Sequence, residues 1–405
     1  MKKDWVVKKL GEVCEIDLGR TPSRGNKSFW DTEKTTNNVW LSIADLLNGD
    51  GQFVSDSKEY VSDKGAKICK VVKTGTLLVS FKLTLGRLAF AARDLFTNEA
   101  IAALPIKNEK LLSKEYLYYY LSYFDWTSAS DGDIKIKGRT LNKEKLKEIQ
   151  IPLPPLPEQH RIVGILGEAL DTIATVKENA EKNLQNAREI FASYLQSVFA
   201  NPGDGWEEKS LEELGNITSS KRIFKSEYVK EGVPFYRTKE IKELANGKSI
   251  SLELFISRTR YNEIKANFGV PKEGDILLSA IGTIGEIYVV QKNNEFYFKD
   301  GNIVWLKNFD SVDTYYLKYA LQSFVEQIKI LSRGAAYSAL TIEKLNKYRV
   351  PIASVKEQKR IVTKLDSLLD ETKKLEAIYE QKLSNLDKLK KSVLQRAFNG
   401  ELSGE

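Results

Sequence analysis

An internal repeat constrains this chain more than any other feature, because its second half matches its first half about 200 residues later. Trp5 corresponds to Trp206, and further along the offset is 199 residues. A repeat of this length excludes a short-period solenoid and predicts two related domains in one chain. The clearest matches are GTLLVS at 75–80 with GDILLS at 274–279, and IPLPPLPEQHRIV at 151–163 with VPIASVKEQKRIV at 350–362.

Each half begins with about 150 residues of short strand-like runs, broken by Gly, Asn and Asp, and ends in a long helical pattern. The sequence therefore predicts an α+β fold with two globular domains in tandem, each followed by a long helix. We expect a first globular domain at 1–152, a central helical region at 153–200, a second globular domain at 201–351 and a C-terminal helical region at 352–405.

Both helical regions follow a proline-bearing entry and carry an apolar stripe spaced alternately by four and three residues. The stripes have polar breaks at equivalent places, Asn183 and Lys382. This favours pairing of the two helices with each other as an antiparallel coiled coil with pseudo-two-fold symmetry. The alternative is that each is a surface helix of its own domain. The residues expected to pair the helices and form a scaffold for partners are Ile162, Leu166, Ile173, Ile361, Leu365, Leu368, Leu375, Leu386 and Leu389.

Composition narrows the possible functions. The formal net charge is +7, which permits nucleic-acid binding without requiring it. Two cysteines, Cys14 and Cys69, are too few for a disulfide framework and indicate a reducing compartment, where we expect them to be small core residues. A single histidine, His160, excludes most sites that need several imidazoles. No segment has the length and apolarity of a signal peptide or membrane span, so we expect a cytoplasmic protein without a membrane partner.

Enzyme signatures fail on inspection. No complete phosphate-binding loop, metal-nuclease cluster or amino-methyltransferase motif is present in the sequence. His160 is replaced by Lys359 in the second half, which favours a solvated or capping role over catalysis. Ser80 and Ser279 end strand-like runs but lie outside any Gly-x-Ser-x-Gly elbow. We therefore expect no catalytic, cofactor-binding or metal-binding residues in this chain.

Basic and polar residues gather in loops at related places in both halves. One group follows the first strand-like run of each half, and another precedes each proline motif. Lys and Arg near Gly can approach phosphates, and forked polar side chains can read base edges. A solvated surface is the alternative for each residue. The candidates for DNA contact are Arg20, Thr21, Ser23, Arg24, Lys27, Lys82, Lys135, Lys137, Arg139, Lys221, Arg222, Arg333, Tyr337 and Ser338.

At IPLPPLPEQHRIVGIL, repeated in weaker form as VPIASVKEQKRIVTKL, the chain resembles the specificity subunit of type I restriction-modification systems. The resemblance covers essentially the whole chain and extends to the GDILLS-type strand in both halves and to the terminal FNGEL. It implies two target-recognition domains, each reading one half of a split, asymmetric site in double-stranded DNA.

The same resemblance implies a non-catalytic chain whose helices dock two methyltransferase subunits and, through them, restriction subunits. S-adenosylmethionine, ATP and Mg would then be bound by those partners and not by this chain. Two alternatives remain open at this point: a coiled-coil DNA-binding adaptor outside restriction-modification, and an enzyme with an unfamiliar site.

Overall fold

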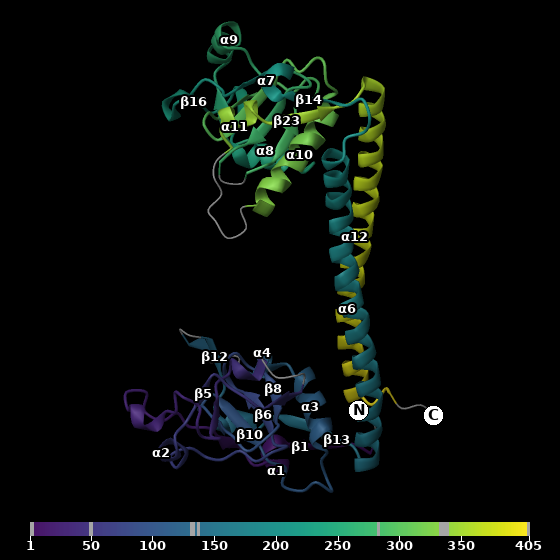
Figure 1. Cartoon of the computed structure of the whole chain (residues 1–405). Helices are drawn as coiled ribbons and strands as arrows, with labels where there is room; N and C mark the ends of the chain where they lie inside the picture. Colours follow the sequence, from purple (N-terminus) through teal and green to yellow (C-terminus); the bar gives the residue numbers. More distant parts are fainter. Residues whose placement is uncertain are drawn as a thin grey trace. The chain divides into compact units, whose positions relative to one another are not determined.

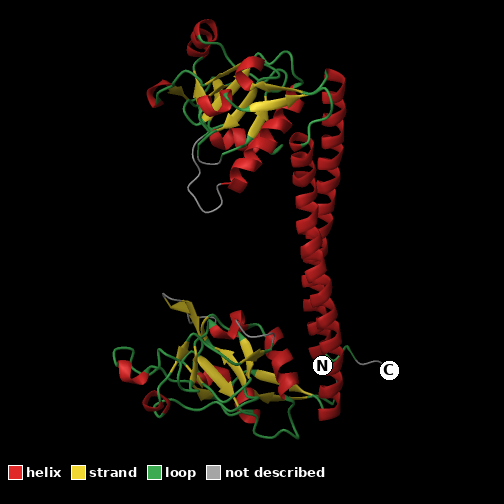
Figure 2. Ribbon diagram, in the orientation of Figure 1, coloured by secondary structure: helices red, strands yellow, loops and turns green. Residues whose placement is uncertain are grey.

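The computed structural model describes residues 4–47, 52–129, 134–135, 138–281, 284–331 and 340–402, with backbone alone at 134–135, 138–140 and 328–331. The chain divides into two compact units, one made of residues 1–180 with 381–405 and the other of residues 181–380. Each unit contains a globular body of strands and short helices together with parts of two long helices (Figures 1 and 2). The α+β content predicted from the sequence is therefore confirmed.

The first unit is built on short strands whose side chains are mostly buried. Its largest described sheet has the order β2-β10-β6-β8-β4, and smaller ladders have the orders β5-β3-β9, β11-β12-β7 and β1-β13. The strands are β1 (Val6–Lys9), β2 (Asp17–Leu18), β3 (Val39–Leu41), β4 (Phe53–Val54), β5 (Glu59–Tyr60), β6 (Leu77–Ser80), β7 (Lys82–Leu83), β8 (Leu88–Ala91), β9 (Phe96–Thr97), β10 (Ile101–Leu104), β11 (Ile134–Lys135), β12 (Gly138–Thr140) and β13 (Gln150–Leu153).

Three short helices of the first unit, α2, α3 and α5, are capped by local side chains. The Ser113 hydroxyl accepts a hydrogen bond from the Tyr116 amide, and Asn142 accepts one from the Lys145 amide, so each satisfies an otherwise unpaired N–H of a first helical turn. The helical segments are α1 (Leu10–Val13), η1 (Lys27–Phe29), η2 (Asp45–Leu47), α2 (Asp63–Ala66), α3 (Lys114–Tyr123), α4 (Trp126–Ala129) and α5 (Lys143–Lys147).

The second unit repeats much of this plan. Its described sheets have the orders β15-β22-β19-β20, β16-β18-β17-β21 and β14-β23. The strands are β14 (Glu207–Ser210), β15 (Asn216–Thr218), β16 (Tyr228–Val229), β17 (Val233–Tyr236), β18 (Phe255–Ile256), β19 (Ile276–Ser279), β20 (Ile287–Val289), β21 (Tyr297–Phe298), β22 (Ile303–Lys307) and β23 (Arg349–Ile352). The helical segments are α7 (Leu211–Leu214), η3 (Lys225–Glu227), α8 (Thr238–Ala245), α9 (Arg258–Asn267), α10 (Thr314–Leu331) and α11 (Ile342–Asn346).

The sequence repeat corresponds to repeated hydrogen bonding. Pro152 lies opposite Val7 in the β1–β13 ladder, and Pro351 lies opposite Glu208 in the β14–β23 ladder. Both ladders have two strands, where a residue without an N–H can be accommodated at the edge. The two domains therefore share a structural unit in which the first and last strands of each globular body pair with each other.

The long helices are α6 (Leu156–Ala200) and α12 (Val355–Phe398), of 45 and 44 residues. Each contributes apolar side chains to the cores of the units. In the first unit, Ile162 and Leu166 of α6 share a buried cluster with Phe398 of α12. In the second unit, Ile361 and Leu365 of α12 share a buried cluster that also holds Phe191, Leu195 and Phe199 of α6.

Ion pairs also join the two long helices within each unit. Lys177 of α6 contacts Asp387 of α12 in the first unit at 2.9 Å. In the second unit, Arg188 of α6 contacts Glu376 at 3.2 Å and Glu380 at 3.0 Å. Exposed pairs of this kind contribute little to stability, but they require that these stretches of α6 and α12 lie side by side.

The burial of side chains along these helices corrects the predicted stripe. Buried or half-buried residues recur every 11 residues, which is 3.67 residues per turn and close to the 3.6 of an α-helix, whereas the predicted spacing of 3.5 drifts off the buried face. Leu375 and Leu389 are accordingly exposed, at 38% and 48%, and their assignment to the pairing face is wrong. The residues on the 11-residue spacing are Ile162, Ile173, Leu184 and Leu195 in α6, and Ile361, Thr372, Leu383 and Leu394 in α12.

The two cysteines differ in environment. Cys14 is buried in the core of the first unit, and burial raises the pKa of its thiol to about 12. Cys69 is only half-buried, and its Sγ lies 3.3 Å from the Arg20 carbonyl oxygen. The core role predicted from the sequence is therefore confirmed for Cys14 and only partly for Cys69. Among the described helices, none combines the length and the apolarity that a membrane crossing requires.

Candidate nucleic-acid interface

The loop after β2 carries most of the candidate residues of the first unit, and its backbone is fixed by two tryptophans. The Trp40 indole N–H donates to the Arg20 carbonyl oxygen at 3.1 Å, and the Trp30 indole N–H donates to the Ser23 carbonyl oxygen at 3.2 Å. Trp40 is buried and meets Trp30 edge to face, with 5.1 Å between ring centroids. The two indole N–H groups thus hold the backbone of the loop, while the side chains of Arg20, Ser23 and Arg24 remain exposed.

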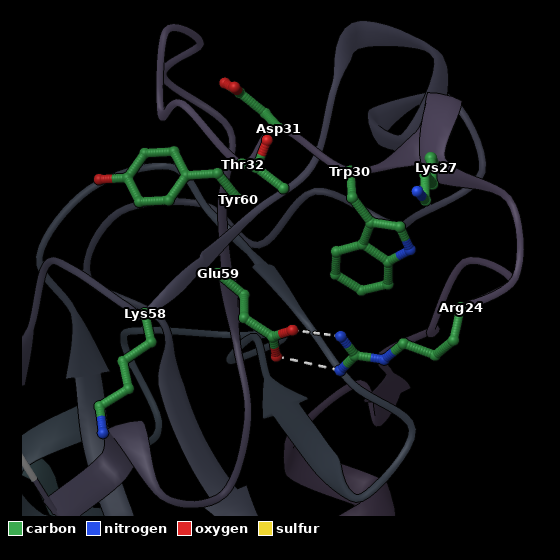
Figure 3. Close-up of a pocket in the computed structure, with 8 residues that line it drawn as sticks. All are labelled: Arg24, Lys27, Trp30, Asp31, Thr32, Lys58, Glu59 and Tyr60. Carbon is green, nitrogen blue, oxygen red and sulfur yellow. Dashed lines mark hydrogen bonds and ion pairs between the residues drawn. The ribbon is translucent and has the colours of Figure 1, made fainter.

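Arg24 is the most tightly positioned of these side chains. Its guanidinium carbon lies 4.1 Å from the centroid of the Trp30 ring and 4.9 Å from that of Trp40. Its Nη1 and Nη2 donate to the two carboxylate oxygens of Glu59 on β5, the second at 3.0 Å. Figure 3 shows the guanidinium and the carboxylate facing each other beside the Trp30 indole. A bidentate pair stacked on aromatic rings fixes the orientation of both charged groups.

A second carboxylate, Glu99, lies among the candidate residues. The Thr21 hydroxyl donates to it, and the charges of Lys82 and Arg24 both act on it. Burial alone would raise the pKa of Glu99, but these interactions and a hydrogen bond from its own backbone amide outweigh burial and leave the pKa below its usual value. The structure therefore brings Lys82 near Thr21 and Arg24, which lie much earlier in the sequence, around one ionised carboxylate.

A cavity of about 590 Å³ opens beside this loop. Its lining residues are Arg24, Lys27, Trp30, Asp31, Thr32, Lys58, Glu59 and Tyr60 (Figure 3). Lys27 begins η1, whose first turn is capped by the Asn26 side chain. The cavity therefore combines two lysines and a forked guanidinium with two carboxylates, Asp31 and Glu59, and with aromatic surface. Its cations are groups that can contact phosphates.

The other basic candidates of the first unit meet at a small ladder. Lys82 lies on β7, which pairs with β12, where Arg139 is opposite Leu83 and Thr140 is opposite Lys82. Lys135 lies on β11, which pairs with β12. The backbone thus brings together two segments separated by more than 50 residues. The side chains of Lys135 and Arg139, and the whole of Lys137, lie outside the described residues.

In the second unit, Lys221 and Arg222 lie in the loop after β15. The Lys221 amide donates to the Tyr297 hydroxyl at 2.6 Å, and its ammonium lies 5.0 Å from the centroid of the Phe268 ring. Arg222 donates through Nε to Asp300 at 2.8 Å, and its side chain is 67% exposed. Arg333, Tyr337 and Ser338 fall outside the described residues. Their role as DNA contacts stays a prediction.

The Glu-Gln motif that carries the resemblance has a structural role in both units. Gln159 is fully buried, accepts a hydrogen bond from the Ser113 amide at 2.9 Å and donates to the carbonyls of Leu111 at 2.9 Å and Pro154 at 2.8 Å. Gln358 accepts from the Asp313 amide at 2.8 Å and donates to the Ala353 carbonyl at 2.8 Å.

The buried glutamine therefore ties the start of each long helix to the segment before α3 or α10. His160, next to Gln159, is exposed, as expected for a solvated residue.

Ser80 and Ser279 likewise stabilise turns. The Ser80 hydroxyl accepts from the Arg87 amide at 2.9 Å, and the Ser279 hydroxyl accepts from the Glu286 amide at 2.9 Å. Both hydroxyls therefore have a structural role that accounts for their position at the end of a strand. Within the part of the chain that the structure describes, no group of three or more His, Cys, Asp or Glu side chains is arranged to hold a metal ion.

The sequence analysis named Arg24 and Lys27 of this surface but missed the cation Lys58, the acceptors Glu59 and Glu99, and the aromatic ring of Trp30. Glu59 is 35 residues from Arg24 and Glu99 is 78 residues from Thr21, so neither pair leaves a local spacing signal. One local signal was present in the sequence. The Thr-Pro-Ser-Arg segment at 21–24 is followed by Trp30, a combination that fits a loop packed around an aromatic ring.

Comparisons with known proteins agree on the family. A family model described as "Type I restriction modification DNA specificity domain" matches residues 2–185 and again 203–384. A proposed type I restriction enzyme specificity subunit of Haemophilus influenzae is 32% identical over 267 residues, which cover 64% of this chain and 66% of that protein, just under two thirds of its length.

A proposed type I restriction enzyme specificity subunit of Methanocaldococcus jannaschii is 24% identical over 437 aligned positions, covering 99% of this chain and 94% of that protein. A chain from a solved structure of a type I restriction-modification system superposes with a TM-score of 0.78 at 21% identity, covering 99% of both chains, which supports the fold. The two family matches cover most of the sequence and coincide with its two repeated halves. This chain therefore belongs to the family of type I restriction-modification DNA specificity proteins.

Proposed function

We propose that this chain is the non-catalytic DNA-specificity subunit of a type I restriction-modification complex. The observation that carries the proposal is the presence of two specificity domains, each with exposed cations on the loop that follows the first strand of its main sheet. Each domain would read one half of a split, asymmetric site in double-stranded DNA. The family match favours this function over a DNA-binding adaptor outside restriction-modification.

The helices serve this function as a spacer and a scaffold. We propose that α6 and α12 pair as an antiparallel coiled coil related by pseudo-two-fold symmetry, which would present the two domains to one duplex. The ion pairs of Lys177 with Asp387 and of Arg188 with Glu376 support the pairing. Two related domains on one duplex would contact half-sites about one helical turn apart.

The remaining chemistry belongs to partners in this proposal. Two methyltransferase subunits would dock on the helices and bind S-adenosylmethionine, and restriction subunits would add ATP- and Mg-dependent cleavage in the cytoplasm. Leu375, Ile378 and Leu389 are exposed apolar residues of α12 and offer surface to such partners. Apolar side chains that leave water on association provide the main driving force for protein docking.

The test is modification-sensitive sequencing of DNA from cells that express this chain with its cognate methyltransferase, beside cells with the methyltransferase alone. Adenine methylation in a split, asymmetric motif that requires this chain is the expected result. Absence of such a motif, with both proteins soluble and associated, would contradict the proposal.

A further experiment tests whether each domain reads its half of the site independently of the other. Replacing residues 1–152 with the first domain of another family member should change one half of the motif and leave the other half unaltered. A change in both halves would contradict independent reading by the two domains.

A further inference from the structure

The Arg24–Glu59 pair presents donors and acceptors side by side on an exposed surface. Two N–H groups of Arg24 are used by Glu59, and three of its five donors remain. A carboxylate offers about four acceptor positions, so Glu59 can also accept further hydrogen bonds. Both side chains are accessible, with exposed fractions of 54% and 37%.

The charges around the pair favour contact with a base edge over contact with a phosphate. Arg24 already has a carboxylate partner, and Glu99 lies near enough for the charge of Arg24 to affect its pKa. Two carboxylates repel a phosphate at this point. Lys27 and Lys58 line the same cavity and are exposed, so their ammonium groups can approach phosphates.

The geometry of the guanidinium is fixed before any ligand arrives. Stacking on Trp30 and Trp40 and the bidentate contact with Glu59 restrict the rotamers of Arg24. A donor fork that is ordered in advance loses less entropy on binding, and its rigidity allows it to distinguish acceptor patterns. Lys27, by contrast, is exposed at the start of η1 and is suited to charge neutralisation.

In the major groove, guanine presents the O6 and N7 acceptors and the paired cytosine presents the N4 amino donor. Guanidinium donors match the guanine edge, and a neighbouring carboxylate matches the cytosine amino group. An A·T pair lacks the double acceptor edge, so it satisfies the guanidinium less well.

We propose that Arg24 and Glu59 together read one G·C base pair in the half-site recognised by the first domain, with Arg24 donating to guanine and Glu59 accepting from cytosine. This inference rests on the proposed function and adds to it the residues and the base pair concerned. Lys27 and Lys58 hold the register through phosphates and do not select the base.

The test uses the full chain in complex with its cognate methyltransferase and compares the wild type with Arg24→Ala, Arg24→Lys and Glu59→Gln. The readout is the methylated motif and the ratio of methylation at matched and mismatched sites. The control is Lys73→Ala in the same unit, an exposed cation that is ion-paired with Asp94 and does not line the cavity.

The expected result is that Arg24→Ala and Arg24→Lys relax selection at one G·C position of one half-site, by roughly 10- to 100-fold, and leave the other half-site strict. Glu59→Gln should weaken selection at the same position. The strict second half-site shows in the same sample that the complex is folded and assembled. Lys73→Ala should keep the wild-type motif.

Three results would overturn the inference. One is a wild-type motif without a G·C pair in the half-site that responds to Arg24. Another is an unchanged motif in Arg24→Ala. The third is wild-type selectivity in Arg24→Lys together with loss of methylation in Arg24→Ala, which would mean that Arg24 contacts a phosphate. A wild-type complex that produces no split motif would instead refute the proposed function itself.

Discussion

Replacing Gln159 with Ala should destabilise the junction between α6 and the first globular body far more than a surface substitution does. The side chain makes three hydrogen bonds of 2.8 to 2.9 Å in a fully buried position. Each buried hydrogen bond contributes about 1 kcal/mol net, and truncation leaves its partner unsatisfied. The expected loss is therefore about 3 kcal/mol in the free energy of unfolding of that region.

Amide hydrogen exchange followed by mass spectrometry can test this prediction. The two compact units can unfold separately, and the method measures the protection of backbone amides in each unit. Protection should fall in α3 and the start of α6, and stay unchanged in α10. The equivalent change, Gln358→Ala, removes two hydrogen bonds and should weaken α10 and the start of α12 by about 2 kcal/mol.

His160→Ala is the matched control, since His160 is the next residue of the same helix turn and is exposed. It should change stability by less than about 0.5 kcal/mol. If Gln159→Ala costs no more than His160→Ala, the motif does not hold the helix in the way argued, and another reason for its repetition is needed.

Three further predictions concern the turn between β7 and β8, the long helix α12 and acid sensitivity. Gly86→Ala should lower the melting temperature in calorimetry, because Gly86 has a φ of +77° and a Cβ there would overlap the Trp126 ring; Gly205→Ala, also at positive φ but in open space, separates backbone strain from the clash. Leu375→Pro should break α12 and abolish association with the methyltransferase in light scattering, whereas Leu375→Ala keeps the helix intact; normal assembly by Leu375→Pro would contradict the scaffold role. Hydrogen bonds from Lys73 and Thr74 lower the pKa of Asp94 to about 2. The stability that the ionised Asp94 contributes is therefore present above its ordinary pKa of 3.8 and is lost as the pH falls towards about 2. Asp94→Asn should remove that part of the pH dependence of the free energy of unfolding.

The sequence predicted the repeated elements well because each has a strong local signal. GTLLVS at 75–80 contains β6, and its repeat GDILLS at 274–279 contains β19. The long helices were expected from proline-bearing entries and from apolar periodicity that continues past one polar break in each stripe, and they extend over 45 and 44 residues. Apolar runs and helix periodicity are properties of neighbouring residues, so they can be read directly from the chain.

The face of each helix was predicted less well. A spacing of four and three fits the first turns of α12, where Ile361 and Leu365 are buried, but by Leu375 the residue on the buried side is the next one along, Glu376, which is half-buried. A difference of 0.1 residue per turn accumulates over several turns. A short stretch of sequence fits a period of 3.5 and one of 3.6 residues per turn equally well. Over the 44 residues of α12 the two periods point to different faces of the helix.

The contents of the candidate site were predicted only in part, for a related reason. Arg24 was expected as a contact from its place in a polar loop, whereas its partner Glu59 lies on a different strand and is brought near by the ladder of β5 with β3. Chain folding, not sequence spacing, determines which carboxylate meets which cation. The function of a charged residue therefore depends on contacts that one sequence does not reveal.

The comparison of the two units suggests how one repeated scaffold would serve the asymmetric DNA site proposed above. The buried hydrogen bonds of Gln159 and Gln358 are alike in both units, and so are the turns at Ser80 and Ser279. The exposed loops differ, since Arg24 is held by a bidentate carboxylate and two indoles, whereas Arg222 has one hydrogen bond to Asp300. Residues that satisfy buried backbone groups cannot change without loss of stability, but exposed donors can. Divergence is therefore concentrated where bases would be read, so the two half-sites should differ in sequence although the domains that read them are related.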